Sequence, residues 1–146
     1  MNSTLILLVL AILSLDCSGK RPEKYGVKNN QLLPCPPSPN CVNSQSDKED
    51  SHYIEAEPYV LSLPEEISLL RKTIQSMPRT KEIEVSDNYL YYEFTSPIMR
   101  YVDDVELYLD DSSKLIHFRS ASRLGTSDLG VNRKRIEAIR SGLRNQ

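Results

Sequence analysis

The chain has 146 residues, 39% of them hydrophobic, with a formal net charge of −2 and a pI near 5.7. This length allows one domain and a flanking segment but excludes a two-domain enzyme, and the acidic balance without an arginine-rich tail argues against a nucleic-acid partner. Residues 47–111 hold sixteen acidic and six basic residues, whereas residues 117–146 hold seven basic and two acidic. This asymmetry indicates internal charge pairing or an end of the molecule that faces an anion.

Residues 1–17 are interpreted as a signal peptide. The apolar run Leu5–Leu13 is too short for the roughly 20 residues that span a bilayer, and it matches the core of an export signal. Cys17 stands where a bacterial lipoprotein carries its lipid, although the two residues before it are larger than usual. We therefore expect lipid on Cys17 to anchor the protein in the bacterial cell envelope, at the periplasmic face of a membrane. The alternative is cleavage after Gly19, which would release a secreted protein.

The chain has three cysteines. If Cys17 carries lipid, Cys35 and Cys41 remain as a pair, with five residues between them in the proline-rich segment CPPSPNC. In an exported protein we expect these two thiols to form a disulfide. A zinc site is the alternative, but the spacing is longer than in typical zinc pairs, and the histidines His52 and His117 are the only others available. We therefore predict no metal and no cofactor.

Residues 18–51 contain many Pro, Asn, Ser, Lys and Glu residues and no sustained apolar period. This composition predicts a flexible tether that includes the Cys35 and Cys41 loop. Residues 52–146 are then expected to form a single domain.

That domain is predicted to begin with a strand at Tyr53–Leu61, which Pro58 makes suitable for a sheet edge. A helix follows over Leu63–Pro78. Pro64 lies in its first turn, two glutamates complement its positive end, and apolar residues recur at helical spacing until the final proline.

Two hairpins come next. The segment KEIEVSDNYLYYEF is predicted to turn at Asp87 and Asn88, with Val85 opposite Leu90 and with the pair Ile83 and Tyr92 further along.

The second hairpin, over residues 102–122, is predicted to turn around Asp111–Lys114. In this register Val105, Leu107 and Leu109 point inward toward the next strand's apolar residues. Glu106 then lies opposite Arg119, with Asp104 diagonal to it, so that an acidic and a basic strand complement each other.

The last element is a helix in which Ile136, Ile139 and Leu143 form an apolar stripe, with Ser127 or Asp128 as its cap. The order strand, helix, four strands, helix predicts an α+β fold. We expect an antiparallel sheet of about five strands with both helices on one face, comparable to helix-grip or TATA-binding-protein-like topology. The other face would be solvated or bound to something.

Three segments, CPPSPNCV, DDVELYLD and RSASRLGTSDLGVNRKRIEAIR, together resemble the family of domain of unknown function 1499. The resemblance runs from about Pro34 to Leu143 and fits a lipoprotein-like member. It implies an exported or membrane-associated protein of the kind found in bacteria, or a plastid protein. Because the family's activity is not established, it implies no catalytic residue.

The candidate site is RSASRLGTSDLGVNR, residues 119–133. On a strand, Arg119 and Arg123 project from one face, and Ser120 and Ser122 from the other. One interpretation makes the whole stretch a strand-to-helix junction, in which the serines satisfy buried polar groups and the following residues cap the helix and tie it to the acidic strand.

The alternative is an anion pocket in which arginines and the helix N-terminus hold a phosphate or carboxylate. Its ligand-binding candidates are Arg119, Arg123, Asp128, Asn132 and Arg133.

The sequence contains no nucleophile elbow, no glycine-rich phosphate loop and no HExxH motif. His117 is also predicted to point away from the serines, so no base is expected beside them. The sequence therefore favours a binding or structural module for a protein partner or a small anionic ligand. The second hypothesis is an enzyme that acts on a cell-envelope component at the arginine-rich junction.

Overall fold

The computed structural model describes residues 18–145, so the predicted signal peptide and Cys17 lie outside the described residues. No helix in this range has the length and hydropathy needed to cross a membrane. The elements in chain order are β1 (Cys41–Asn43), β2 (Glu57–Pro58), α2 (Leu63–Gln75), β3 (Thr80–Val85), β4 (Tyr89–Thr95), β5 (Val102–Asp110), β6 (Leu115–Ser122) and α3 (Val131–Arg144).

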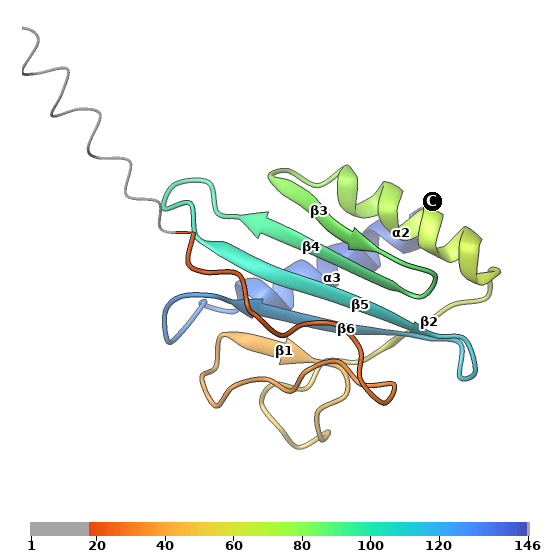
Figure 1. Cartoon of the computed structure of the whole chain (residues 1–146), viewed down its shortest axis with the longest axis horizontal. Coiled ribbons are helices and arrows are strands. Elements are labelled where there is room, and N and C mark those ends of the chain that lie inside the picture. Colours follow the sequence, from red (N-terminus) through yellow and green to blue (C-terminus); the bar gives the residue numbers. More distant parts are fainter. Residues whose placement is uncertain (1–17, 146) are drawn as a thin grey trace, which may run out of the picture.

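The strands form one antiparallel sheet in the order β1-β6-β5-β4-β3, and β2 pairs with the other end of β6. Both helices pack on the same face of this sheet (Figure 1). The α+β prediction is therefore confirmed, and so is the order strand, helix, four strands, helix from β2 onward. The structure adds one strand, β1, that precedes this series.

The main core lies between the sheet and the helices. It forms because alternate residues of β4, β5 and β6 point toward apolar stripes on α2 and α3. Its fully buried members include Leu70 and Ile74 of α2, Ile136 and Ile139 of α3, and Leu90, Val105, Leu107, Leu109, Ile116 and Phe118 of the strands.

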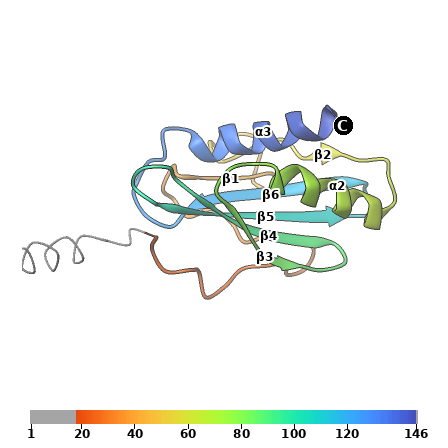
Figure 2. The same ribbon diagram turned by 90° about the horizontal axis from the view of Figure 1, so that it is seen from above.

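The opposite face of the sheet is covered by residues 18–34, which we call the strap. Figure 2 shows the strap on the side of the sheet away from α3. Leu32 of the strap is buried in a second cluster with Tyr89, Tyr91 and Tyr108. Tyr25 adds a ring contact with Tyr91, at 4.8 Å between ring centroids.

The structure differs here from the predicted tether over residues 18–51. β1 lies within that segment and pairs with β6, and the strap packs on the sheet. The composition of the segment did not predict this packing. A few apolar side chains that follow no helical or strand period are enough to cover a row of tyrosines. The sheet face that we expected to be solvated or bound is thus covered by the chain itself.

The first hairpin matches the prediction near its turn and departs from it further along. Val85 lies opposite Leu90 as expected, but Tyr92 lies opposite Glu82 because the register shifts between Glu82 and Glu84. This irregularity turns Ile83 to the strap face, where it packs on the tyrosine cluster. The predicted pairing of Ile83 with Tyr92 is wrong.

The second hairpin has the predicted register, with Glu106 opposite Arg119. The first predicted strand is much shorter than expected, because only Glu57–Pro58 pairs with β6. The first helix ends at Gln75, before Pro78, with Ser76 as its C-cap.

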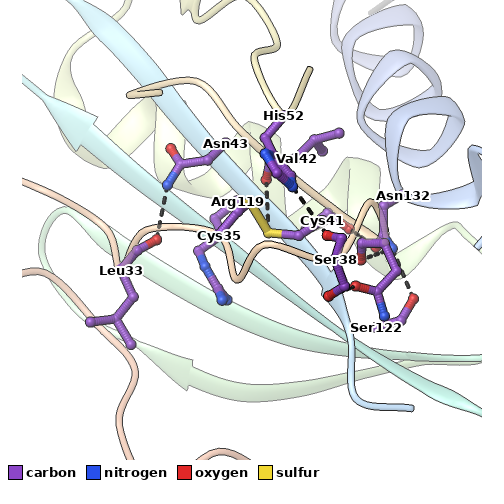
Figure 3. Close-up of a disulfide and its surroundings, with 12 residues drawn as sticks. Leu33, Cys35, Ser38, Cys41, Val42, Asn43, His52, Arg119, Ser122 and Asn132 are labelled. Atoms are coloured by element: carbon purple, nitrogen blue, oxygen red, sulfur yellow. Dashed lines mark hydrogen bonds between the residues drawn. A yellow bond between two sulfur atoms is a disulfide. The ribbon is translucent and has the colours of Figure 1, made fainter. Parts of the chain in front are cut away.

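Cys35 and Cys41 form the predicted disulfide, with their Cα atoms 5.7 Å apart. It closes the loop that leads into β1 (Figure 3). Beyond the disulfide, the Asn43 amide donates a hydrogen bond to the Leu33 carbonyl at 2.9 Å, which joins β1 to the end of the strap. The disulfide therefore fixes the place where the strap meets the edge of the sheet.

We predict that replacing both Cys35 and Cys41 with Ser lowers the free energy of unfolding by about 2 kcal/mol, because the unfolded chain gains the freedom of an open loop. Urea denaturation of the full chain measures this loss. A reductant should destabilise the wild type by a similar amount and leave the double variant unchanged. Equal stability of the oxidised and reduced wild type would contradict this role.

Candidate functional site

The strand-to-helix junction divides its side chains between the two faces of the sheet. Arg119 and Arg123 lie on the strap face, beside the carboxylates of β4 and β5. Ser120 and Ser122 point to the helix face, where both contact Asn132. The two halves of the stretch therefore belong to different environments.

Arg123 is the centre of an ion network under the strap. Its guanidinium group donates to both carboxylate oxygens of Asp104, at 2.9 and 2.6 Å, and to Glu93 at 2.5 Å. Arg21 of the strap donates to the same Glu93 oxygen at 2.6 Å. Burial alone would lower the pKa of Arg123, but the bonds with Asp104 and Glu93 outweigh it and raise that pKa. Arg123 is therefore charged and fully engaged.

Arg119 is paired through a single contact, and its buried Nε atom has no hydrogen-bond partner among the described residues. It donates to Glu106 at 3.1 Å, and Glu106 is 1% exposed. The same carboxylate accepts hydrogen bonds from the Tyr89 hydroxyl and from the backbone of Gly26 in the strap, each at 2.7 Å. An anion from outside would have to displace the strap and a buried carboxylate to reach either arginine.

On the helix face, Asn132 joins the junction to β1. It is completely buried, it accepts a hydrogen bond from Ser120 at 2.5 Å, and its amide donates to Ser122 at 2.9 Å and to the Asn40 carbonyl at 3.0 Å. The N-cap residue of α3 is Gly130, with a φ of 78°, and not Ser127 or Asp128 as predicted. The Asp128 carboxylate, two residues earlier, accepts hydrogen bonds from the backbone amides of Gly130 and Asn132 at 3.0 and 2.8 Å. Burial would raise the pKa of Asp128, but these amide bonds lower it overall.

Arg133 lies apart from both groups and donates to the Ser51 carbonyl at 3.0 Å. The tie between α3 and the acidic strand comes instead from Arg135, whose guanidinium group reaches Asp103 at 2.6 Å and lies over the Phe94 ring. Sequence reasoning missed Arg135. Two residues along a helix correspond to a rotation of about 200°, so Arg133 and Arg135 lie on nearly opposite faces of α3. This spacing could have shown that only one of them can reach the sheet.

The predicted ligand-binding residues thus fall in three places. Arg119 and Arg123 lie under the strap, Asp128 and Asn132 brace the start of α3, and Arg133 contacts the loop after β1. The structure does not gather them into one pocket.

A different hollow opens at the end of the sheet where β4, β6 and the start of α3 meet. It consists of two adjoining clefts of about 420 and 530 Å³, which share Ser96, Asp103 and Val131 in their walls. We call this pair the end cleft. Ser122 and Asp128 of the junction line its larger part.

The smaller part of the end cleft has apolar walls and a basic rim. Met77, Phe94 and Val131 supply the apolar surface, and Arg79 and Lys134 supply positive charge. The Lys134 side chain is exposed and has no hydrogen-bond or ion-pair partner among residues 18–145. The acid in the wall, Asp103, is already paired with Arg135, so the uncompensated charge at the rim is positive.

Sequence reasoning also missed a contact between Ser44 and His117, whose Oγ and Nδ1 atoms are 3.2 Å apart. The Ser44 hydroxyl also accepts a hydrogen bond from the backbone of Phe118 at 2.9 Å. Burial lowers the pKa of His117, with an opposing effect from Asp110. Neither member of the pair lines the end cleft, and the pair attaches the loop after β1 to β6.

Within residues 18–145 no group of three His, Cys, Asp or Glu side chains is placed to hold a metal ion.

A family model described as "Protein of unknown function (DUF1499)" matches residues 31–143, which is more than half of the chain. No curated protein and no solved structure gives a significant match.

We predict that Arg123→Met lowers the free energy of unfolding by about 3 to 5 kcal/mol, because it leaves the buried Asp104 carboxylate without a cation and Glu93 with Arg21 alone. Arg133→Met removes a guanidinium group that contacts only a backbone carbonyl, and it should change stability by less than about 0.5 kcal/mol.

Arg123→Lys keeps the charge but loses the forked contact, so an intermediate loss is expected. Denaturant unfolding of the four proteins measures the series. Equal losses for Arg123→Met and Arg133→Met would show that the ion network contributes nothing specific.

Proposed function

The chain belongs to the DUF1499 family of proteins of unknown function, and on that premise we propose that it is an exported, membrane-anchored binding module. Its ligand is a small molecule with an anionic group and an apolar part, and the end cleft holds it. The observation that carries the proposal is the cleft itself, where apolar walls meet a lysine that no described residue pairs.

Export and anchorage are supported by two separate features. Disulfides persist in oxidising compartments outside the cytosol, and Cys35 and Cys41 are paired in this protein. The apolar run Leu5–Leu13, followed by Cys17, has the order of an export signal and a lipid attachment site. Both features favour a position at the outer surface of a membrane.

Binding at the end cleft is supported by the way in which charge is distributed. Two arginines of the junction, Arg119 and Arg123, form ion pairs with buried carboxylates, namely those of Glu93, Asp104 and Glu106. The end cleft has two acids in its walls. Asp103 is paired with Arg135, and the Asp128 carboxylate accepts hydrogen bonds from backbone amides at the start of α3, so Lys134 and Arg79 at the rim of the smaller part form no ion pair with either acid. The phenyl ring of Phe94 and the side chains beside it would hold the apolar part of the ligand.

We predict that the full chain, kept in mild detergent, binds butyl phosphate saturably at millimolar concentration and does not bind butanol. Lys134→Glu should weaken binding by at least about tenfold, because it reverses the charge at the rim. Lys48→Glu, at an exposed position outside the cleft, is the matched control and should bind as the wild type does. Amide chemical shifts in NMR spectra measure the affinities. If the wild type shows no saturable shifts around the cleft, the binding proposal fails.

We also predict that the full chain, expressed in a bacterium that processes lipoproteins, incorporates labelled palmitate. Cys17→Ser should abolish the label, because no other cysteine stands after the apolar run at the lipidation position. The double replacement Cys35→Ser and Cys41→Ser serves as the control and should remain labelled. An unlabelled wild type would favour the secreted form cleaved after Gly19.

A further inference from the structure

Large apolar side chains are exposed mainly at one end of the domain. Of the nine that are exposed among the described residues, five lie in the loop between β4 and β5 or in the segment between β6 and α3, and a sixth is the first residue of α3. They are Ile98, Met99, Tyr101, Leu124, Leu129 and Val131. Ile98 and Leu129 are the most prominent, at 86% and 87% exposed. We call these two segments the end loops.

The end loops lie beside each other and beside the end cleft. Tyr101, Leu124 and Val131 line the larger part of the cleft. Figure 1 shows both segments at the same end of the sheet, opposite the β5–β6 turn. An exposed apolar surface of this kind, gathered on neighbouring loops, marks an interaction site.

Basic side chains surround the end loops. Arg79, Arg100 and Lys134 are exposed there, and Lys20 follows at the start of the strap. The nearest acids are engaged, since Asp128 binds the amides of α3 and Asp103 binds Arg135. Apolar side chains within a positive rim complement a bilayer that contains anionic lipid.

The described chain also begins at this end (Figures 1 and 2). Gly19 lies so close to Leu124 that a Cβ added to it would be 3.0 Å from the Leu124 Cγ atom. Ser18 directly follows Cys17, and consecutive Cα atoms are about 3.8 Å apart. Gly19 and Arg21 of the strap already contact the domain, so the described chain begins beside the end loops without a free tether.

From these features we infer that the end loops lie in the surface of an anionic bilayer, with Ile98 and Leu129 inserted among the lipids. This inference rests on the proposed membrane anchorage and adds an orientation to it. The end cleft then opens at the level of the lipid head groups, so its amphiphilic ligand is drawn from the membrane. The opposite end, with the β5–β6 turn and the connection from β2 to α2, points away from the bilayer.

The absence of tryptophan from the chain allows a direct test, because a single introduced indole is the only one in the protein. The full chain is reconstituted into phosphatidylcholine and phosphatidylglycerol vesicles, with or without bromine on the acyl chains. Ile98→Trp and Leu129→Trp place the reporter in the end loops. Val60→Trp places it at the opposite end, where Val60 is 94% exposed, and is the matched control. Circular dichroism checks that each variant is folded.

We predict that brominated lipid quenches the fluorescence of Ile98→Trp and Leu129→Trp at least about twofold more than that of Val60→Trp. The emission of both end-loop variants should shift to the blue when vesicles are present. Flotation of the same samples reports anchorage separately from orientation.

If the chain floats with the vesicles but all three variants show the same weak quenching, the proposed orientation is wrong and the anchorage still stands. A blue shift of Ile98→Trp that appears without vesicles and grows with protein concentration would show that a second copy covers the end loops, which also overturns the inference. Chain that does not float overturns both proposals.

Discussion

Three carboxylates on the strap face of the sheet, those of Glu93, Asp104 and Glu106, can be buried only because guanidinium groups lie against each of them. Removing a charge from water costs several kcal/mol, and only a close partner of opposite sign offsets that cost. Arg123 spans two of the three acids, and Arg21 brings the strap to one of them. These ion pairs join β4, β5 and β6 on this face and hold the strap against them.

The need to neutralise buried carboxylates also limits where an anion from outside can bind. An arginine that neutralises a buried acid is unavailable to an incoming anion, so the most conspicuous residues of the junction serve the fold. Free positive charge remains where β4 ends and α3 begins, at Lys134 and Arg79, and there it meets exposed apolar side chains. The proposed binding site therefore lies at an end of the sheet, while the strap covers the face that carries the ion network.

Much of the fold followed from local pattern, and the failures have physical causes. The pairing of Val85 with Leu90 was predictable because a tight turn fixes the register beside it, whereas the irregularity between Glu82 and Glu84 has no mark in the sequence. β1 and the strap were missed because their contacts are made with residues far along the chain. At the site, the alternation of serines and arginines on β6 was predictable, but the choice between Arg133 and Arg135 depends on how α3 is rotated against the sheet.

The edges of the sheet affect how copies of this domain can meet one another. β1 and β2 together cover both ends of β6, and the remaining edge, β3, has an irregular register and bears Lys81, Glu82 and Glu84. Charged and bent edge strands resist pairing with strands of other molecules. Under the proposed anchorage, copies confined to a membrane would collide edge to edge, and these edges would oppose their joining into a continuous sheet.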